Sequence, residues 1–501
     1  MKTKLSTLVI LFSCSLIFAQ NSNYKGQLVD SLSGESIPYA SIVFGENLGI
    51  ISNDDGYFTI ESNILYNEGL DSLTISSLGF QNKTLALNKD LDTIIYLNPA
   101  VYSLGSVYVP TENLEVDEII DRFYDKLDDN HPDLYISSKL FYRQSLITKM
   151  DKMHFELKES TIEGFDKNLL DSIESVIPKE TAYYFEMAGM REGNFEQGKF
   201  KVERAAELYD KEKDLSFEGI SEQLEQLFNK NVKKNSYFKI KSGLFSTKVQ
   251  ADELFYEEEN EDEVDKTPEK KIDSVPTYNR FTGFENSINR LFNNLFYRDD
   301  STLDIMEKKS RYNWSLDGYD QIDNHSVYKI TFEPKGSKDF AGSLYIDMED
   351  FAAMRIDFHN VKPLRSFNLL GISYYNDVYT GKVIFKQQET GYFPKYIEVV
   401  DRESVGVSRP LKIIEKNKFV KGRRKQNEIS LKMDIKVKNI SKHELLLLDV
   451  NSSSLDNFKN LKRNTGFEPV YLKEFDPQFW SEYLIIEPNE TIQNFKIEDS
   501  E

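Results

Sequence analysis

The chain is poor in cysteine, and that scarcity excludes several kinds of chemistry. Its only cysteine, Cys14, lies in an N-terminal segment that we predict to be removed, so the mature chain has none. Disulfides, thiolate metal sites and a cysteine nucleophile are therefore excluded. We expect the folded protein to be stabilised by its hydrophobic cores.

Catalytic and cofactor motifs are also missing from the sequence. No histidine belongs to a His-Glu-x-x-His motif or another metal-ligand spacing, and there is no Gly-x-Ser-x-Gly elbow, phosphate-binding glycine loop or dinucleotide fingerprint. The histidines are His131, His154, His325, His359 and His443. We predict a non-enzymatic protein with no catalytic residue, cofactor or metal. The enzymatic alternative is a hydrolase of envelope polymers, whose two carboxylates would converge to roughly 5–10 Å on folding.

Positive charge is scarce relative to negative charge. The chain has 62 Lys and Arg against 83 Asp and Glu, a net charge of −21. This balance repels nucleic acid over long range, so we expect no nucleic-acid partner. Beyond the N-terminal segment the densest apolar run is Leu445–Leu448, far short of the roughly 20 residues that span a membrane as a helix. The mature protein is thus predicted to be soluble or peripheral to a membrane.

The N-terminus resembles a secretion signal. Lys2 and Lys4 precede an apolar core, Leu5–Phe18, which is too short for a spanning helix and is followed by Ala19-Gln20. We predict a signal peptide over residues 1–19 and an exported protein, periplasmic or associated with the outer membrane. The alternative is a lipoprotein modified at Cys14, against which the bulky Phe12 and the apolar run beyond the cysteine both argue.

Residues 20–109 alternate apolar and polar side chains in short runs between turn-rich segments, which predicts a β-sandwich. We expect one hairpin from Gln27–Val29 and Ala40–Phe44, and a second within Gly49–Ile60. The runs Leu73–Ile75 and Thr93–Leu97 complete the sandwich. The Asn53–Gly56 stretch is interpreted as a tight turn closed by Asx side chains, with calcium ligation as the alternative.

The spacing of turn and core residues in this module resembles the carboxypeptidase regulatory-like domain of Bacteroidetes envelope proteins. The residues that carry the resemblance are Gly26, Val29, Asp30, Gly34, Pro38, Ala40, Val43, Gly49, Asp55-Gly56, Phe58, Gly79-Phe80 and Leu97. The resemblance implies an immunoglobulin-like or transthyretin-like sandwich without catalysis, which we expect to serve as a docking module.

Residues 113–501 predict a larger α+β domain, so that the whole protein is mainly β. A short helix is expected where Val116, Ile119 and Phe123 recur at helical spacing, and strand-like runs then dominate. The clearest strand is 429–437, with every second residue apolar. Within this region, Gly342–Asp347 followed by Phe351–Asp357 resembles paired strands of periplasmic lipoprotein carriers. That likeness implies a curved antiparallel sheet wrapped on helices, with an apolar hollow.

A broader similarity, from Glu118-Ile119-Ile120 and His131-Pro132 to residues 475–480 and 486–488, is to an uncharacterised Bacteroidetes outer-membrane family. Longer members of that family append a barrel, and no pore role is carried over to this sequence. The similarity implies an envelope partner or a lipid-like ligand. An assembly role in an outer-membrane complex is the second alternative.

An apolar stripe at helical spacing supplies the candidate ligand-binding or lid residues. They are Phe284, Ile288, Leu291, Phe292, Leu295 and Phe296. Packing against the sheet as ordinary core is the alternative interpretation. A weaker stripe, Ile220, Leu224, Leu227 and Phe228, is predicted to be a second helix.

Three further segments have distinctive compositions. Acidic residues crowd the stretch near 252–277, which predicts a solvated loop, with calcium or a basic partner as alternative roles. Lys421–Lys425 is a basic tip between two strands, interpreted as a hairpin turn, with phosphate or headgroup contact as the alternative. Phe479 and Trp480 are predicted to pack onto the second domain as a C-terminal latch.

Overall fold

The computed structural model describes residues 23–45, 48–61, 64–65, 69–87, 92–100, 114–233, 236–250, 277–419, 424–463 and 467–497. The predicted signal peptide with Cys14, nearly all of the acidic stretch and residues 420–423 of the basic tip lie outside these ranges. The chain divides into two compact units, which are taken one at a time.

The first unit consists of residues 1–111, 320–326 and 476–494. Among its described residues, two small sheets have the strand orders β4-β1-β7 and β3-β2-β5-β6. Their strands are β1 (Asn23–Asp30), β2 (Ser41–Phe44), β3 (Leu48–Ile51), β4 (Tyr57–Glu61), β5 (Ser72–Ser76), β6 (Lys83–Ala86) and β7 (Asp92–Leu97). Alternate apolar residues such as Leu28, Ile42 and Ile75 are fully buried. The C-terminal segment adds η2 (Pro477–Trp480) and α10 (Glu490–Gln493).

The predicted strands of this unit exist, but the predicted hairpins were wrong. β1 pairs with β4 and β7, whereas β2 pairs with β3 and β5. Each expected hairpin therefore joins strands of different sheets. Alternation of apolar residues determines which face of a strand is buried, but it does not choose the neighbouring strand.

The predicted turn between β3 and β4 is confirmed in its details. The Asn53 side-chain oxygen accepts hydrogen bonds from the backbone amides of Asp55, at 3.0 Å, and Tyr57, at 2.8 Å. Gly56 has a φ of 78°, which favours glycine. The Asp54 carboxylate accepts a hydrogen bond from the Tyr39 hydroxyl within the same unit. The Asn53 side chain thus pairs with backbone amides of the turn where the chain passes from one sheet to the other.

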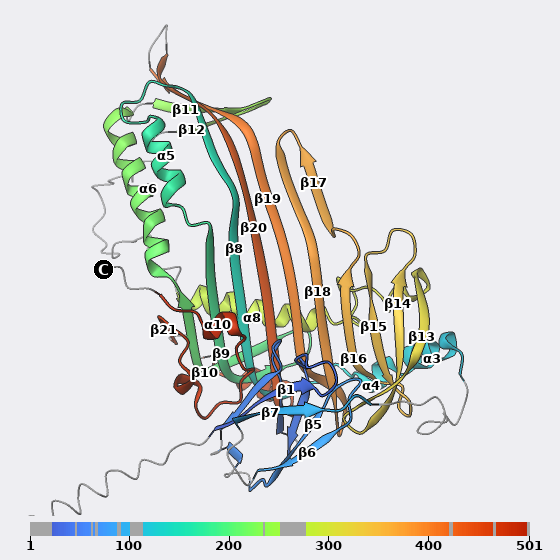
Figure 1. The fold of residues 1–501 in the computed structure, drawn as a ribbon. Helices are drawn as coiled ribbons and strands as arrows, with labels where there is room; N and C mark the ends of the chain where they lie inside the picture. Colours follow the sequence, from blue (N-terminus) through green and yellow to red (C-terminus); the bar gives the residue numbers. More distant parts are fainter. Residues whose placement is uncertain are drawn as a thin grey trace, which may run out of the picture. The chain divides into compact units, whose positions relative to one another are not determined.

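The second unit is built on one large antiparallel sheet. Its main path among the described residues is β13-β14-β15-β16-β18-β19-β20-β8-β9-β10-β21, with β17 on β18 and the β11–β12 pair on β19 (Figure 1). The strands are β8 (Ile136–Ser160), β9 (Glu180–Gly193), β10 (Gly198–Tyr209), β11 (Ser236–Ser242), β12 (Phe245–Gln250), β13 (Tyr312–Ile322), β14 (His325–Pro334), β15 (Phe340–Asp347), β16 (Ala353–Asn360), β17 (Arg365–Leu369), β18 (Ile372–Gln388), β19 (Gly391–Asn417), β20 (Lys425–Ser452) and β21 (Val470–Leu472).

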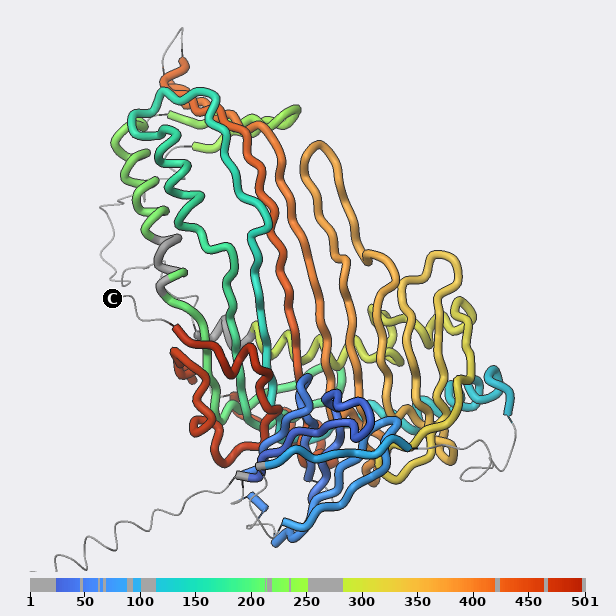
Figure 2. The backbone as a smooth tube through the Cα atoms, in the orientation of Figure 1, coloured from blue at the N-terminus to red at the C-terminus, as the bar shows by residue number. Residues whose placement is uncertain are grey.

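Three central strands are much longer than the rest. β8, β19 and β20 have 25, 27 and 28 residues, and they run side by side beyond the ends of β14, β15 and β16 (Figure 2). At about 3.3 Å per residue, strands of this length extend on the order of 80–90 Å. β18 pairs with β19 only as far as Val407, and β11 takes its place from Lys412 onward.

Helices cover separate parts of this sheet. α8 (Thr277–Asn293) lies across several strands, while α5 (Lys167–Val176) and α6 (Lys211–Asn231) lie beside part of β8 (Figure 1). α5 begins at Asp166, whose side chain accepts a hydrogen bond from the Leu169 amide at 3.0 Å. The remaining helical elements are α3 (Val116–Asp125), α4 (Leu127–Asn130), η1 (Lys309–Arg311) and α9 (Leu455–Asn460).

The predicted fold class is confirmed: the protein is mainly β, with small sheets, one large curved sheet and a few helices. Among the described residues, no helix is both long enough and apolar enough to cross a membrane.

Candidate functional site

The large sheet has two faces of opposite character, as its longest strand shows. Along β20, Met433, Ile435 and Val437 lie on one face, and the charged residues between them lie on the other. The first face continues to His443, whose Nδ1 lies 2.7 Å from the hydroxyl of Tyr142. The ring of Tyr142 contacts Phe185, and Phe185 stacks on Phe284 of α8 with 3.5 Å between the ring centroids. We name this side of the sheet the α8 face.

Two rows of apolar side chains cross five strands on the α8 face. Directly paired residues of neighbouring strands share a face, so the pairing of β17, β18, β19, β20 and β8 determines both rows. The first row is Leu369, Ile372, Val407, Ile435 and Met153, and the second is Phe367, Tyr374, Val405, Val437 and Met150. We name these ten residues the apolar strip.

The apolar strip is not a buried core. Leu369 is 56% exposed, Phe367 47% and Val405 42%, and the members nearer to β8 are only half-buried. A contiguous exposed apolar surface of this kind is uncommon on a soluble protein and is typical of binding sites. It is the feature of the second unit that most directly suggests a ligand.

The helices α5 and α6 cover the strands on one side of the strip. Ile429 and Leu431 of β20 are buried there beneath α5. The predicted α6 stripe packs against the same cluster, through Ile220, Leu224, Leu227 and Phe228. This helix pair therefore forms one boundary of the strip.

A belt of polar side chains lies on the other side of the strip, between it and the region covered by α8. Asn376 donates to the Asp401 carboxylate at 2.7 Å, and the Tyr374 hydroxyl donates to Glu403 at 2.5 Å. Burial raises the pKa of Asp401 above its usual range, and the hydrogen bond to Glu403 raises the pKa of Tyr374. The apolar strip therefore has a polar border.

One atom of this polar belt is unsatisfied within the described structure. Asn376 is 8% exposed, and its side-chain oxygen is buried without a hydrogen-bond partner there. A buried acceptor without a donor is costly, so it is a natural contact for a donor group on a ligand. Arg290 is an exposed residue of α8, and its positive charge acts electrostatically on Asp401 and on His443. Burial and this charge together lower the pKa of His443 to about 4.

The predicted α8 stripe lies mainly in the core beside the strip. Ile288, Leu291, Phe292, Leu295 and Phe296 are 0–7% exposed, and Phe284 is half-buried on Phe185. Their aromatic contacts reach other elements, with Phe292 near Phe195 and Phe296 near Phe385. The stripe thus packs against the sheet, and its role as a ligand contact or lid stays a prediction.

The predicted latch residues lie in the segment that clusters with the first unit. Trp480 is 2% exposed, and its ring contacts Phe479 and Tyr483 edge-on, at 5.0 and 6.3 Å between ring centroids. Phe479 is half-buried. The sequence interpretation had placed both residues on the second domain, and the latch role stays a prediction.

Truncating the buried indole tests how much this segment contributes to stability. Trp480→Ala is expected to lower the free energy of unfolding by roughly 3–5 kcal/mol, the usual cost of emptying a large aromatic site. Urea unfolding followed by circular dichroism measures it. A loss below about 1 kcal/mol, as expected for an exposed side chain, would contradict the prediction.

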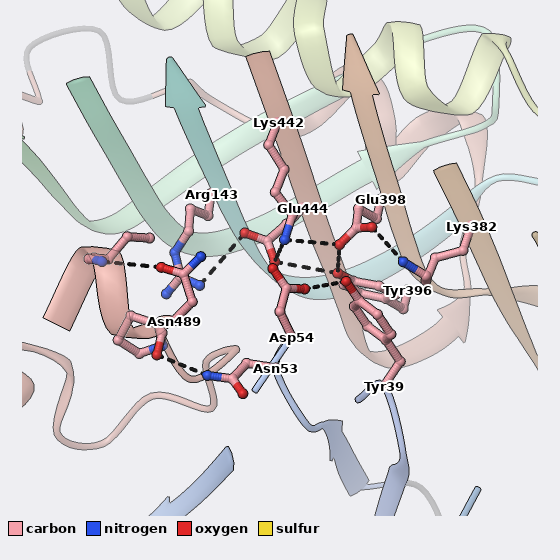
Figure 3. A network of polar contacts seen from close by, with 12 residues as sticks. Tyr39, Asn53, Asp54, Arg143, Lys382, Tyr396, Glu398, Lys442, Glu444 and Asn489 are labelled. Atoms are coloured by element: carbon pink, nitrogen blue, oxygen red, sulfur yellow. Dashed lines mark hydrogen bonds and ion pairs between the residues drawn. The ribbon is translucent and has the colours of Figure 1, made fainter. Parts of the chain in front are cut away.

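Sequence reasoning missed a buried charged network on the opposite face of the sheet (Figure 3). Arg143 of β8 donates to Glu186 of β9 at 2.6 Å, and both side chains are almost fully buried. Lys442 of β20 lies 3.1 Å from Glu398 and 3.2 Å from Glu444. In the sequence these are single charges within strand-like runs, and only the strand register brings them together on one face of the sheet.

Two cavities in the second unit bear on the hydrolase alternative. One, of about 340 Å³, is lined by Glu180 and Asp210, but these carboxylates pair with Lys149 and Lys213. The other, of about 410 Å³, is lined by Asp117 and Asp121, of which Asp121 pairs with Lys309. Glu180, Asp210 and Asp121 are thus engaged in ion pairs, and the hydrolase alternative stays a prediction.

No protein-family model matches the chain, and no curated protein matches it significantly. Among solved structures, it is similar to a LolA-superfamily protein of Nitrosomonas europaea, with 9% identity over 70% of this chain and 98% of that one, at a TM-score of 0.19. A DUF1329-family protein of Desulfovibrio piger matches with 8% identity over 68% and 94%, at 0.18. MucB in the MucA/MucB complex of Pseudomonas aeruginosa matches with 7% identity over 68% and 100%, at 0.15.

TM-scores of this size do not establish a shared fold, so the proposals below rest on the geometry of this chain. The resemblance of residues 24–109 to the carboxypeptidase regulatory-like domain likewise stays a prediction.

Proposed function

We propose that this chain is a non-enzymatic cell-envelope protein whose second unit binds an amphiphilic ligand, with its acyl chain on the apolar strip. The observation that carries the proposal is the pair of exposed apolar rows on the α8 face. Covering such a surface is favourable by roughly 25 cal/mol per Å² of apolar area removed from water. The signal-like N-terminus and the sandwich with its resemblance to envelope modules support the location.

The polar belt accounts for the other end of the ligand. A ligand lying along the strip would place its polar group beside Asn376, whose free oxygen accepts a hydrogen bond, and near the Arg290 guanidinium. Ligand sites commonly combine a mostly apolar lining with a few polar groups that orient the bound molecule. An acyl chain with a polar end therefore fits this face better than a purely apolar molecule does.

Placing a charge on the strip tests this function. In Val405→Glu a carboxylate enters the second row, and we expect the variant to lose at least tenfold in affinity for a fluorescent fatty acid, because the new charge must be desolvated. Ser408→Glu is the matched control: it makes the same side chain on the same strand, at an exposed position on the opposite face. Mass spectrometry of lipid extracts from the exported protein should show bound acyl compounds in the wild type and in the control only.

Equal binding by both variants would overturn the assignment of the strip. Wild-type protein that carries no acyl compound and binds no fatty acid would overturn the proposed function itself. Because Val405 is already 42% exposed, the substitution is not expected to impair folding, and circular dichroism checks this.

A further inference from the structure

We propose that the far end of the long strands docks on an anionic lipid membrane. The docking surface consists of the β11–β12 hairpin, the tip of the β17–β18 hairpin and the adjoining ends of β19 and β20 (Figure 1). We name it the basic rim. The observations that support lipid contact here are separate from those that assign a ligand to the apolar strip.

The basic rim presents large apolar side chains at its tips. Leu244 is 87% exposed and Phe245 58% exposed at the β11–β12 tip, and Leu370 is 49% exposed at the β17–β18 tip. At the end of β19, Phe419 is 78% exposed. Two turns, at the β11–β12 and β17–β18 tips, therefore hold apolar groups out into solvent where polar turn residues are the usual choice, and the end of β19 adds a third apolar group.

Arg409 of β19 joins two of these tips into one surface. Its guanidinium donates to the Ser242 carbonyl at 2.5 Å and lies 4.9 Å from the centre of the Phe245 ring. The backbone of its neighbour Ser408 donates to the Gly371 carbonyl at 2.7 Å. A side chain added at Gly371 would meet Arg409 at 2.9 Å, so the β17–β18 tip also packs closely against this arginine.

The charge of the rim is opposite to that of the protein as a whole. Residues 236–250, 408–419 and 424–432 contain ten Lys or Arg and only two carboxylates, in a chain whose net charge is −21. The basic residues are Lys239, Lys241, Lys248, Arg409, Lys412, Lys416, Lys418, Arg424, Lys425 and Lys432.

Both carboxylates of the rim point inward. Glu415 is 1% exposed and accepts hydrogen bonds from the Lys233 amide and from Asn427. Glu428 is 3% exposed and pairs with Lys412 and Lys425, which hold its pKa at about 2. Within these three segments the outward-facing charged side chains are therefore all Lys or Arg.

Apolar tips among cations match the chemistry of an anionic membrane surface. Leu and Phe side chains enter the boundary between headgroups and acyl chains, while Lys and Arg contact the phosphates. A nucleic acid would use the cations alone and leave the exposed leucines in water. The acidic remainder of the molecule would orient it with the rim towards the membrane.

Vesicle flotation of the full mature chain tests the proposal, with phosphatidylcholine vesicles that contain or lack phosphatidylglycerol. We expect binding only to the anionic vesicles and weaker binding at high salt. Leu244→Asp and the double variant Lys241→Glu/Lys248→Glu should each bind about tenfold more weakly or worse, because each places negative charge at the membrane surface.

Matched controls separate the rim from a general charge effect. Leu32→Asp is the same substitution as Leu244→Asp, made at a leucine of the first unit that is 82% exposed. Lys459→Glu/Lys462→Glu repeats the double charge reversal at exposed lysines away from the rim. Both controls should bind as the wild type does. Absence of binding to anionic vesicles, equal binding to neutral ones, or equal loss in controls and rim variants would each overturn the proposal.

Discussion

Arg143→Met is expected to lower the free energy of unfolding by about 3–5 kcal/mol, the usual cost of removing one partner of a buried ion pair. Arg143 and Glu186 are 1% and 0% exposed and lie 2.6 Å apart. The substitution leaves the Glu186 carboxylate in the interior without its guanidinium, and a buried carboxylate is stable only when it is paired and hydrogen-bonded. Urea unfolding at neutral pH measures the loss.

The same two strands provide the control for this change. Lys149 and Glu180 are also directly paired across β8 and β9 and lie 3.2 Å apart, but their side chains are 43% and 54% exposed. Lys149→Met should therefore cost less than about 1 kcal/mol. The double variant Arg143→Met/Glu186→Leu should recover part of the loss, since it removes both charges of this pair while Glu444, which also lies 3.8 Å from Arg143, keeps Lys442 as its partner. Equal effects at the buried and exposed pairs would refute the argument.

Acidification from pH 6.5 to pH 4 is expected to remove about 3 kcal/mol of stability through His131 alone, because its pKa falls from 6.5 to about 4 on folding. Burial is the main cause. Nδ1 lies 3.1 Å from the Tyr392 carbonyl and Nε2 accepts from the Ala353 amide at 3.1 Å, which together fix a neutral ring with its proton on Nδ1. A proton on Nε2 would face another donor.

The sign follows from the two pKa values. Above pH 6.5 the ring is neutral in both states, and the full stability is present. Between pH 6.5 and 4 only the unfolded chain takes up the proton, so the free energy of unfolding falls as the pH falls. His443, whose pKa is also about 4, adds a loss in the same window.

The slope of unfolding free energy against pH measures the His131 contribution without depending on the starting stability. His131→Gln should reduce that slope by about one proton, or about 1.4 kcal/mol per pH unit, in the middle of the range from pH 4 to 6.5, and by about half as much at either end. A wild-type slope in His131→Gln would show that this ring does not titrate between the two states.

Strand positions and faces were readable from the sequence where side chains alternate strictly. The run Ile429, Leu431, Met433, Ile435 and Val437 does lie on one face of β20. Its burial, however, is uneven: Ile429 and Leu431 lie beneath α5, whereas Met433, Ile435 and Val437 are only half-buried. Periodicity identifies an apolar face but does not show which part of it a distant helix covers.

The strip and the rim were beyond sequence reasoning for a related reason. Phe367, Val405 and Met150 are far apart in the chain, and only the pairing of β17, β18, β19, β20 and β8 places them in one row. Arg424 and Lys425 were visible as part of a basic run, but the pairing of β11 with β19 was needed to place Lys239 and Lys241 on the same part of the sheet. Register across non-local strands is set by tertiary packing, which one sequence does not reveal.

The uninterrupted length of β19 and β20 has a thermodynamic consequence. The same two strands pass from the region beneath α8, through the polar belt and the apolar strip, to the basic rim, and they stay paired from Tyr396 to Lys416. If the hydrogen bonds between β19 and β20 open in one region, the paired residues of the neighbouring region become easier to separate. The regions along these two strands therefore open as one cooperative unit. The proposed ligand binding on the strip and the proposed membrane attachment at the rim would both favour the paired state of β19 and β20, so the two events would be positively linked without any change of shape.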